Sequence, residues 1–522
     1  MRRRRLIPLL LLLLPAACGE KEPVPEPARP AVRVELQEAL SSQAVFTVQT
    51  IQCAGIRYGC ALADETVLPD QELPTSGTGS TTLTLTLDRL SPNRHYQLGV
   101  QGIGPGGEEG RVETYDFFTS PRSGDLYEWE QTRTGRPFLA DMTLVPGPSS
   151  HRNPLDWSQE RWLSHVAYTD PDGREHWLFD SFLLIEGQQT GVYGQPITTF
   201  VITDDDRPSG TRSQWQQLLD FWFTGGSFPW QESYWGNGMD TFGRWYSGET
   251  RTVTFPEGQL DALEACVAAV SARIGPPRHK RYVVMALPEP IYFDNYIRAI
   301  HNGGGSTVYW GSLDGRNLDF SRVDDRVAAY KWFMDETRKA FGQKGYRYIE
   351  LAGFYILPEV LSTSWRPEYK RYDQVIPAVA DYAHNCREGL YWIPYCMAEG
   401  YDKWQDFGFD MAYMQPNYYW EPEQKPMAAT FQAIGQYRMG LELEFEYSMV
   451  ENVNGAASAQ TYRERFAEYL SWAQSSHVYG QRPLALYSGT DALHQLANSP
   501  LAGDQAMYHQ LCQFIIDSPL KK

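Results

Sequence analysis

The feature that most constrains the fold is an alternation that begins near Gly135 and continues to the end of the chain. Short runs that are apolar on both faces, as buried parallel strands are, alternate with amphipathic stretches of helix length. Strands are predicted over 162–169, 179–185, 282–287, 348–355, 390–396, 409–415, 440–446 and 484–488. Helices are predicted over 213–223, 257–274, 322–341, 372–385, 428–437 and 458–475.

Eight parallel strands with crossover helices predict a (β/α)8 TIM-like barrel over residues 135–522. An open doubly wound sheet is the competing architecture. It would need a spaced glycine-rich phosphate loop after an early strand, and Gly303, Gly304 and Gly305 are consecutive instead. Residues 224–254 contain three tryptophans and are too long for a simple connection, so they are expected to cap the mouth of the barrel.

Residues 31–120 have the different pattern of a small all-β sandwich. Short alternating strands are separated by turn residues. The run Leu90-Ser-Pro-Asn-Arg-His-Tyr96, a glycine-rich turn and Phe117-Phe-Thr-Ser120 together resemble a fibronectin type III module. The resemblance implies that Tyr96 is the corner tyrosine and that the module is a spacer.

The first 18 residues resemble a lipoprotein signal peptide. Arg2 to Arg5 precede an apolar run over 6–14 that is too short to span a bilayer. Leu14-Pro-Ala-Ala-Cys18 resembles a bacterial lipobox, so Cys18 is expected to be lipidated, with a plain secretory signal as the alternative. The Gly-Glu-Lys-Glu that follows resembles the tract of some surface lipoproteins. We therefore expect an anchor in the bacterial outer membrane, facing the cell surface or periplasm, and a proline-rich linker over 19–30.

Composition excludes several function classes. The net charge of −18 disfavours a nucleic-acid partner because no basic footprint is available to neutralise phosphates. Cys53 and Cys60 are close enough in sequence to form a disulfide in an oxidising compartment. No Cys-x-x-Cys or His-x-x-x-His spacing occurs, so we expect no metal site and no organic cofactor.

Polar residues at the predicted carboxyl ends of the strands indicate where the site of such a barrel lies. They are carboxylates, amides and phenols with almost no Lys or Arg, which suits a neutral polyol better than a phosphorylated substrate. Aromatic faces can stack on the C–H surfaces of a sugar. The residues expected to bind substrate are Asp180, Tyr355, Tyr395, Gln415, Asn417, Tyr418 and Glu442.

The stretch 440–447 carries the strongest chemical signal. Leucine and phenylalanine alternate with Glu442, Glu444 and Glu446, so an extended backbone places three carboxylates on one face. Glycoside hydrolysis needs two carboxyl groups that flank the bond, one as acid and one as nucleophile or base. We expect Glu444, with Glu446 as second choice, to react together with Glu359 after the fourth strand. Glu359 as a helix-capping or surface acid is the alternative.

Acid after strand four and nucleophile on strand seven resembles the arrangement of the large retaining glycosidase clan. Pro358 stands where that clan usually has Asn, so retention or inversion stays open.

Several ordered motifs resemble the domain-of-unknown-function family numbered 4855, over about residues 164–489. That family is found in bacterial secreted proteins and lipoproteins, and the resemblance implies a glycosidase-like barrel. The motifs are Phe179-Asp-Ser-Phe-Leu183, Leu351-Ala-Gly-Phe-Tyr355 with Glu359, Trp392-Ile-Pro-Tyr395, Gly408-Phe-Asp410, Gln415-Pro-Asn-Tyr418 and Gly440-Leu-Glu-Leu-Glu444.

These patterns together predict a lipid-anchored glycoside hydrolase that degrades an oligo- or polysaccharide. A non-catalytic glycan-binding lipoprotein that uses the same barrel mouth is the rival, because aromatic and amide side chains serve binding equally well. A metal-dependent hydrolase would have to rely on Glu442 to Glu446 alone, since the sequence has no histidine cluster.

Overall fold

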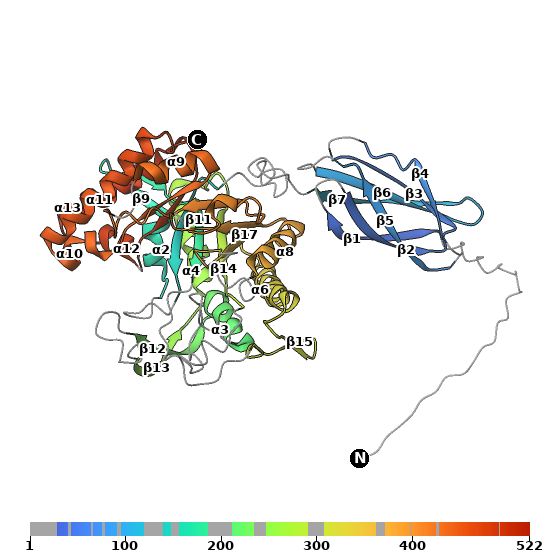
Figure 1. The fold of residues 1–522 in the computed structure, drawn as a ribbon, viewed down its shortest axis with the longest axis horizontal. Helices are drawn as coiled ribbons and strands as arrows, with labels where there is room; N and C mark the ends of the chain where they lie inside the picture. Colours follow the sequence, from blue (N-terminus) through green and yellow to red (C-terminus); the bar gives the residue numbers. More distant parts are fainter. Residues whose placement is uncertain are drawn as a thin grey trace, which may run out of the picture. The chain divides into compact units, whose positions relative to one another are not determined.

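The computed structural model describes residues 29–39, 43–63, 66–75, 79–90, 95–119, 139–147, 156–185, 211–233, 247–290, 307–361, 371–396, 398–423, 427–489 and 491–521. Cys18 and the segment around it lie outside these residues. The chain forms two compact units, one drawn from residues up to Phe117 and a larger one that contains Phe118–Lys522 (Figure 1). No helix among the described residues is long and apolar enough to cross a membrane.

The N-terminal unit is the predicted β-sandwich. One sheet has the order β1 (Ala31–Ala39), β2 (Gln43–Ile51), β5 (Thr81–Asp88), and the other β4 (Gln71–Pro74), β3 (Gly55–Leu62), β6 (His95–Ile103), β7 (Glu109–Phe118). Phe46 and Val48 of β2 and Leu98 of β6 are fully buried between them. Tyr96 stacks on Phe117 at 5.6 Å, while the turn 91–94 that the expected corner tyrosine would face lies outside the described residues. Cys53 and Cys60 are both free.

The larger unit is a closed barrel of eight parallel strands, as predicted. In chain order the strands are β8 (Asp141–Pro146), β11 (Ser181–Ile185), β14 (Arg281–Leu287), β17 (Ile349–Ile356), β18 (Gly389–Trp392), β19 (Met411–Met414), β20 (Gly440–Glu444) and β21 (Leu484–Tyr487). Each pairs with the next, and β21 closes the ring on β8, with Leu484 level with Asp141.

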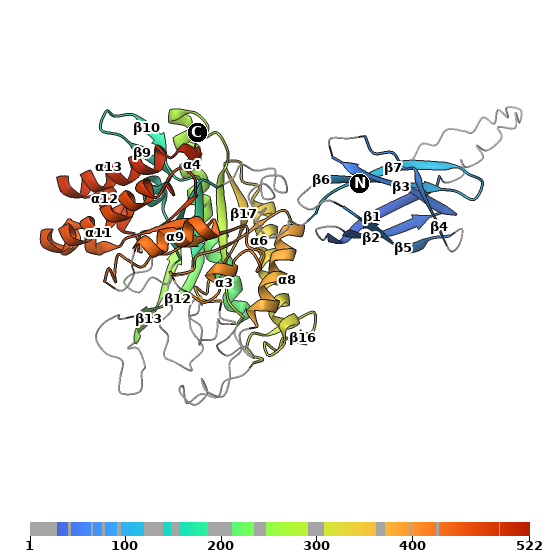
Figure 2. The same ribbon diagram turned by 45° about the horizontal axis from the view of Figure 1, so that its top comes forward.

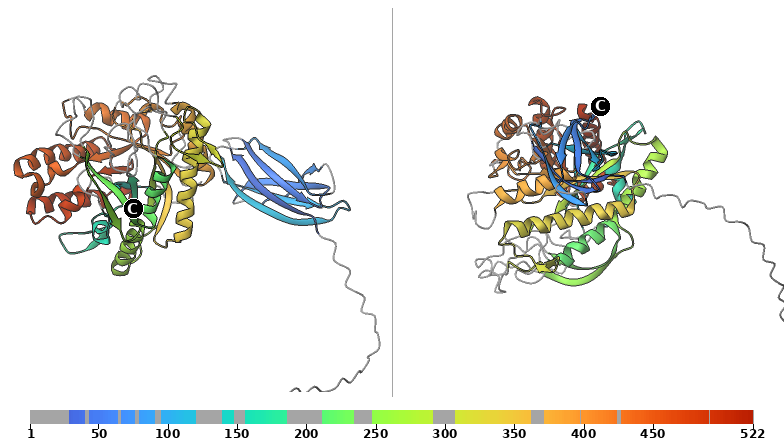
Figure 3. Two further views of the ribbon diagram at one scale, coloured as in Figure 1. Left: turned by 90° about the horizontal axis from the view of Figure 1, so that it is seen from below. Right: turned by 90° about the vertical axis from the view of Figure 1, so that its right-hand side faces the viewer.

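Helices cover the outside of the barrel. They are α2 (Gln159–Val166), α3 (Arg212–Phe223), α4 (Gln259–Ile274), α6 (Val323–Lys344), α8 (Tyr372–Asn385), α9 (Met427–Tyr437), α10 (Glu451–Asn454), α11 (Ala456–Ser475), α12 (Ala492–Ala497) and α13 (Ala502–Ile516). Figures 1 and 2 agree that α11, α12 and α13 lie on one side of the barrel and that α6 and α8 lie together on the other. Figure 3 shows the same separation from below.

The first predicted strand, 162–169, is wrong. Its residues form the end of α2 and a short strand, β9 (Ala167–Thr169), which pairs outside the barrel with β10 (Glu175–Trp177). The helix forms because Ser158 caps it, accepting a hydrogen bond from the Arg161 N–H at 3.4 Å, and because Trp162 and Val166 bury one helical face. The first barrel strand is instead the fully buried β8.

Residues 224–254 form most of an antiparallel hairpin, β12 (Gly226–Ser233) and β13 (Ser247–Phe255). Phe255 packs edge-on against Phe221 of α3 at 4.8 Å, so the base of the hairpin is anchored to that helix. Residues 234–246, between the two strands, lie outside the described residues, and the expected cap over the mouth stays a prediction.

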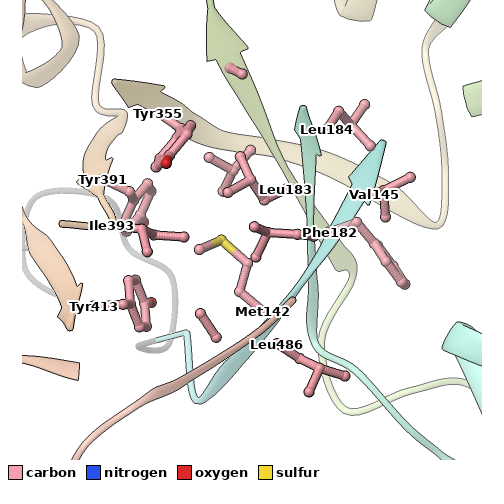
Figure 4. Packing of buried hydrophobic residues seen from close by; sticks show 14 of the residues in the cluster. Met142, Val145, Phe182, Leu183, Leu184, Tyr355, Tyr391, Ile393, Tyr413 and Leu486 are labelled. Atoms are coloured by element: carbon pink, nitrogen blue, oxygen red, sulfur yellow. The ribbon is translucent and has the colours of Figure 1, made fainter. Parts of the chain in front are cut away.

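The interior of the barrel is filled by side chains of alternate residues. Figure 4 shows Tyr355, Tyr391 and Tyr413 on one side of this interior, and Met142 and Leu183 on the other. Glycine makes room for the large rings: a Cβ on Gly440 would lie 2.5 Å from the Tyr413 ring. The strand register shows which residues share the interior face. Tyr355 is level with Tyr391, and Ala485 is level with both Glu442 and Met142.

Candidate active site

Strand β20 carries the central carboxyl groups. Glu442 and Glu444 are 2 % and 0 % exposed, and they are level with Ala485 and Tyr487 of β21. Phe445, on the opposite face, packs against Phe466 of α11 at 5.4 Å. Because neighbouring residues of a strand point to opposite faces, Glu442 and Glu444 share the face turned away from α11. Glu444 is also the last residue of β20, so it lies at the carboxyl end of the barrel strands.

The two oxygens of Glu444 have different surroundings. Oε2 accepts hydrogen bonds from the Tyr469 hydroxyl at 2.5 Å and from the Asn417 backbone N–H at 2.7 Å, and the Gln415 side chain also donates to this carboxyl group. Oε1 is buried and has no hydrogen-bond partner among the described residues. One oxygen is therefore fixed in place, while the other is left for a reacting group.

The protonation of these groups is strongly perturbed. Burial raises the pKa of Glu444 to about 8, with a further contribution from Glu359, while the hydrogen bonds from Tyr469, Asn417 and Gln415 act in the opposite direction. Burial, followed by the charges of Glu444 and Glu359, raises the pKa of Glu442 well above its ordinary value. At neutral pH the three carboxyl groups consequently cannot all be ionised, and the site can hold protons.

Glu359 reaches this cluster from a different strand. It follows the end of β17 by three residues and is exposed. The Trp392 indole N–H donates to the Pro358 carbonyl at 2.7 Å, which fixes the turn immediately before it. The Glu359 carboxylate raises the pKa of Tyr355, Glu442 and Glu444, each after the larger effect of burial or of a closer partner. Glu359 therefore interacts electrostatically with both Glu442 and Glu444.

Tyr487 is the last residue of β21 and lies beside the carboxyl groups. Burial raises its pKa, and the charges of Glu446, Glu442, Glu359 and Glu444 add to that effect. The Tyr487 ring lies 6.0 Å from that of Trp420, which is half-buried. The phenol is therefore in electrostatic contact with all four glutamates.

Tyr469 was missed by sequence reasoning. It lies on α11, where an aromatic residue at helical spacing is ordinarily core, and no local signal distinguishes it. Only the docking of α11 against β20 brings its hydroxyl to Glu444.

Glu446 lies beyond the end of β20 and is half-buried. The Ser448 hydroxyl donates to its Oε1 at 3.4 Å. Gly489 packs closely on it: a Cβ there would lie 3.1 Å from the Glu446 Cβ. Glu446 is therefore a neighbour of Tyr487 at the rim of the cluster.

The residues after β18 and β19 are brought together in part as predicted. Tyr395 and Gln415 form an isolated parallel bridge, and the Gln415 amide donates to Asn417 Oδ1 at 3.0 Å. The Tyr418 hydroxyl is hydrogen-bonded to Glu468, which raises the pKa of Tyr418 to about 12. Its ring contacts Tyr469 edge-on at 6.0 Å, so Tyr418 lies beside the residue that donates to Glu444.

Asp180 was expected at the mouth, and this placement is wrong. It precedes the first residue of β11, and its Oδ1 accepts a hydrogen bond from Arg281 Nη1 at 2.6 Å, where β14 begins. Asp180 lies where β11 begins, at the opposite end of the barrel from Glu444, the last residue of β20, and the predicted strand 179–185 already had this residue at its amino end.

No group of three or more His, Cys, Asp and Glu side chains arranged to hold a metal ion occurs in the part of the chain that the structure describes. What the cluster offers chemically is a pair of carboxyl groups from strands four and seven, a third buried carboxyl group and two phenols.

Comparison with known proteins gives one match that covers the barrel. The family model described as "Domain of unknown function (DUF4855)" matches residues 141–228 and 251–513. A search of curated proteins finds no match.

Three solved structures each match a small part of the chain. The sensor domain of the anti-sigma factor RsgI4 of Pseudobacteroides cellulosolvens is 11% identical, covering 18% of this chain and 97% of its own, at a TM-score of 0.14. A structure described as a myokine is 21% identical over 19% of this chain and 100% of its own, at 0.15. The fibronectin type-III domain of human fibronectin type III domain containing protein 3 is 23% identical over 19% and 90%, at 0.14.

Proposed function

Since this chain belongs to the DUF4855 family over the residues that form the barrel and carry the carboxyl cluster, we propose a function for that cluster: hydrolysis of a glycosidic bond in a neutral glycan. The observation that supports the proposal is the electrostatic interaction between Glu359 and Glu444, which are 85 residues apart in the chain. Two carboxyl groups that flank the scissile bond are what this chemistry requires.

Glu444 serves as nucleophile or water-activating base in this proposal. The Tyr469 hydroxyl, the Asn417 N–H and the Gln415 amide all stabilise its ionised form, which attack or proton abstraction needs. Its Oε1 is not engaged by any described residue and is the oxygen that would react.

Glu359 serves as the general acid that protonates the leaving oxygen. Its exposed position after β17 lets it reach a bond that enters from solvent, and a carboxyl group beside the leaving oxygen can supply the proton. In a retaining reaction it then activates the water that releases the sugar. A carboxyl separation of about 5–5.5 Å would give retention and about 6.5–9.5 Å inversion.

A neutral substrate fits the electrostatics. No Lys or Arg contributes to the shifted pKa of Glu442, whereas a phosphorylated or carboxylated sugar would require cations there. Tyr487 and Trp420 supply phenol and indole faces beside the carboxyl groups, suited to sugar hydroxyls and C–H surfaces.

The test is a screen of the protein against plant, algal and host glycans with release of reducing ends as the readout. On a cleaved glycan, we expect Glu359→Gln and Glu444→Gln each to lower kcat by about 10³-fold or more while circular dichroism and Tm stay close to wild type. Glu423→Gln removes the same charge from an exposed position and is the matched control.

Near-wild-type turnover in both active-site variants would remove the assignment. Saturable binding of a glycan without cleavage of any member of the panel would favour the non-catalytic reading of the same mouth.

A further inference from the structure

A second pocket of about 920 Å³ lies at the opposite end of the barrel from the carboxyl cluster. Its lining residues occur where strands begin: Arg281 is the first residue of β14, Arg438 precedes β20, and Arg482 precedes β21. Glu444 and Tyr487, by contrast, are the last residues of β20 and β21. The pocket is therefore separate from the proposed active site.

The lining is strongly cationic in a chain whose net charge is −18. Six Lys and Arg residues face two carboxylates, Glu175 and Asp180, an excess of four positive charges. Asp141 and Glu350 lie outside the lining and pair with Lys521 and Lys280, and counting these two carboxylates as well reduces the excess to two positive charges. The six cations are Arg278, Lys280, Arg281, Arg438, Arg482 and Lys521.

Arg281 gives this pocket a rigid floor. It is 5 % exposed, its Nη1 donates to Asp180 at 2.6 Å, and its guanidinium lies 4.8 Å from the Trp177 ring centroid. Its Nε is buried with no hydrogen-bond partner among the described residues. A desolvated cation with unused donor capacity is costly unless an acceptor compensates it.

Exposed cations form the rim of the pocket. Arg278, Lys280 and Arg438 are exposed, and Arg482 is half-exposed. The Arg482 guanidinium makes no ion pair with any residue that the structure describes. Like charges gathered around a concave surface repel one another and concentrate anions, so a bound anion would stabilise this end of the barrel.

We propose that this pocket binds a phosphate-bearing ligand. One phosphoryl group carries a charge of about −1.5 to −2 at neutral pH and three acceptor oxygens, which matches the residual charge and the several guanidinium forks better than a single carboxylate does. The proposal is independent of the hydrolase activity at the other end of the barrel.

The test is isothermal titration calorimetry of residues 19–522 with inorganic pyrophosphate at physiological ionic strength, supported by the shift of Tm. We expect saturable binding of one pyrophosphate per chain and a rise in Tm. The double variant Arg278→Gln/Arg482→Gln should bind about tenfold more weakly or worse, because each lost charge-assisted hydrogen bond is worth about 1.5–3 kcal/mol.

The matched control is Arg33→Gln/Lys403→Gln, which removes two exposed positive charges that do not belong to the pocket lining. It should retain wild-type affinity. The absence of saturable binding in the wild type, or equal weakening in both double variants, would overturn the proposal, because the latter would report only net charge.

Sedimentation with vesicles distinguishes the two sources of a phosphate group. Binding to phosphatidylglycerol vesicles but not to phosphatidylcholine vesicles, lost in Arg278→Gln/Arg482→Gln, supports the proposal and assigns the ligand to a lipid headgroup. Pyrophosphate binding without vesicle binding supports it and assigns the ligand to a soluble phosphate compound.

Discussion

At the scale of single residues, the chemistry of the candidate active site depends on how one carboxyl group is held. Burial raises the pKa of Glu444, and hydrogen bonds from Tyr469, Asn417 and Gln415 oppose that effect. Two of these donors, the Tyr469 hydroxyl and the Asn417 N–H, bind the same oxygen, Oε2. Tyr469 is the donor at the shortest distance, so it is a positioning residue whose hydroxyl tunes the acidity of Glu444. Its removal should alter the pH dependence of catalysis as well as its rate.

We predict that Tyr469→Phe moves the acid limb of the pH profile of kcat/KM upward by about one pH unit. The hydroxyl lowers the pKa of Glu444 by stabilising the carboxylate, so its loss raises that pKa, and the ionised form then requires a higher pH. Activity falls most below pH 8 and recovers toward alkaline pH. Tyr418→Phe is the control, because that hydroxyl bonds to Glu468 instead. An acid limb that is unchanged in Tyr469→Phe would contradict this role.

At the scale of elements, the loop after β19 delivers a backbone donor to the site. Asn417 has a φ of 58°, in the left-handed region, and this conformation directs its N–H toward Glu444. Asn tolerates this region better than other residues with a Cβ, since its short polar side chain can bond locally, here with Gln415. Asn417 thus has two roles in this loop: its backbone adopts a positive φ, and its side chain accepts a hydrogen bond from Gln415.

Substitution of Asn417 should separate these two requirements. We expect Asn417→Ala to lower the free energy of unfolding of the barrel by about 1 kcal/mol more than Asn417→Gly does, because glycine adopts positive φ without steric cost. Urea unfolding followed by tryptophan fluorescence measures the difference. Asn417→Gly should also retain more glycan-cleaving activity, since it preserves the donor to Glu444. A glycine variant less stable than the alanine variant would show that the side-chain contact dominates.

At the scale of the whole barrel, charged side chains are buried where the strands begin, at the end opposite the proposed active site. Asp141, at the start of β8, accepts a hydrogen bond from Lys521 of the 3-10 helix Pro519–Lys521 at 2.5 Å and another from the Asp180 N–H at 2.7 Å. Burial raises its pKa to about 6, although Lys521 acts to lower it. Lys521, far away in the chain, therefore helps to hold together the starts of β8 and β11, since it also bonds to the Leu178 carbonyl.

Lys521→Met should destabilise the barrel in a pH-dependent way. Asp141 then keeps its burial without its cation, so its folded pKa rises further above the unfolded value, and ionisation costs more stability as pH rises. We expect a loss of about 3 kcal/mol at pH 8 and a smaller loss at pH 5, where the carboxyl group is protonated. Tm measured at both pH values tests this, and Lys521→Met/Asp141→Asn should restore most of the loss at pH 8. Equal losses at the two pH values would exclude this mechanism.

Local periodicity explains why much of the fold could be predicted. β14 is recognisable as a short run of apolar residues, and β20 is recognisable by its alternation of apolar and acidic residues. Helices such as α8 are recognisable by the helical spacing of their apolar residues. These patterns depend only on the backbone geometry of a few neighbouring residues. The same patterns give the wrong prediction at 162–169, because a short aromatic and apolar run fits both the strand period and the helix period. Packing against α4, where the Trp162 indole N–H donates to the Gln259 carbonyl, stabilises the helix.

The sequence by itself determined the barrel, the sandwich and the strand that carries Glu442 and Glu444, since these depend on patterns within one segment. Only the tertiary structure decided which distant groups lie beside these two glutamates. Tyr469 of α11 and Glu359 after β17 interact with Glu444. Asp180 lies at the opposite end of the barrel, where it binds Arg281. The reason is physical. A strand specifies which face a side chain takes, whereas the meeting of two strands or a helix at one point depends on barrel closure and on packing over the whole molecule.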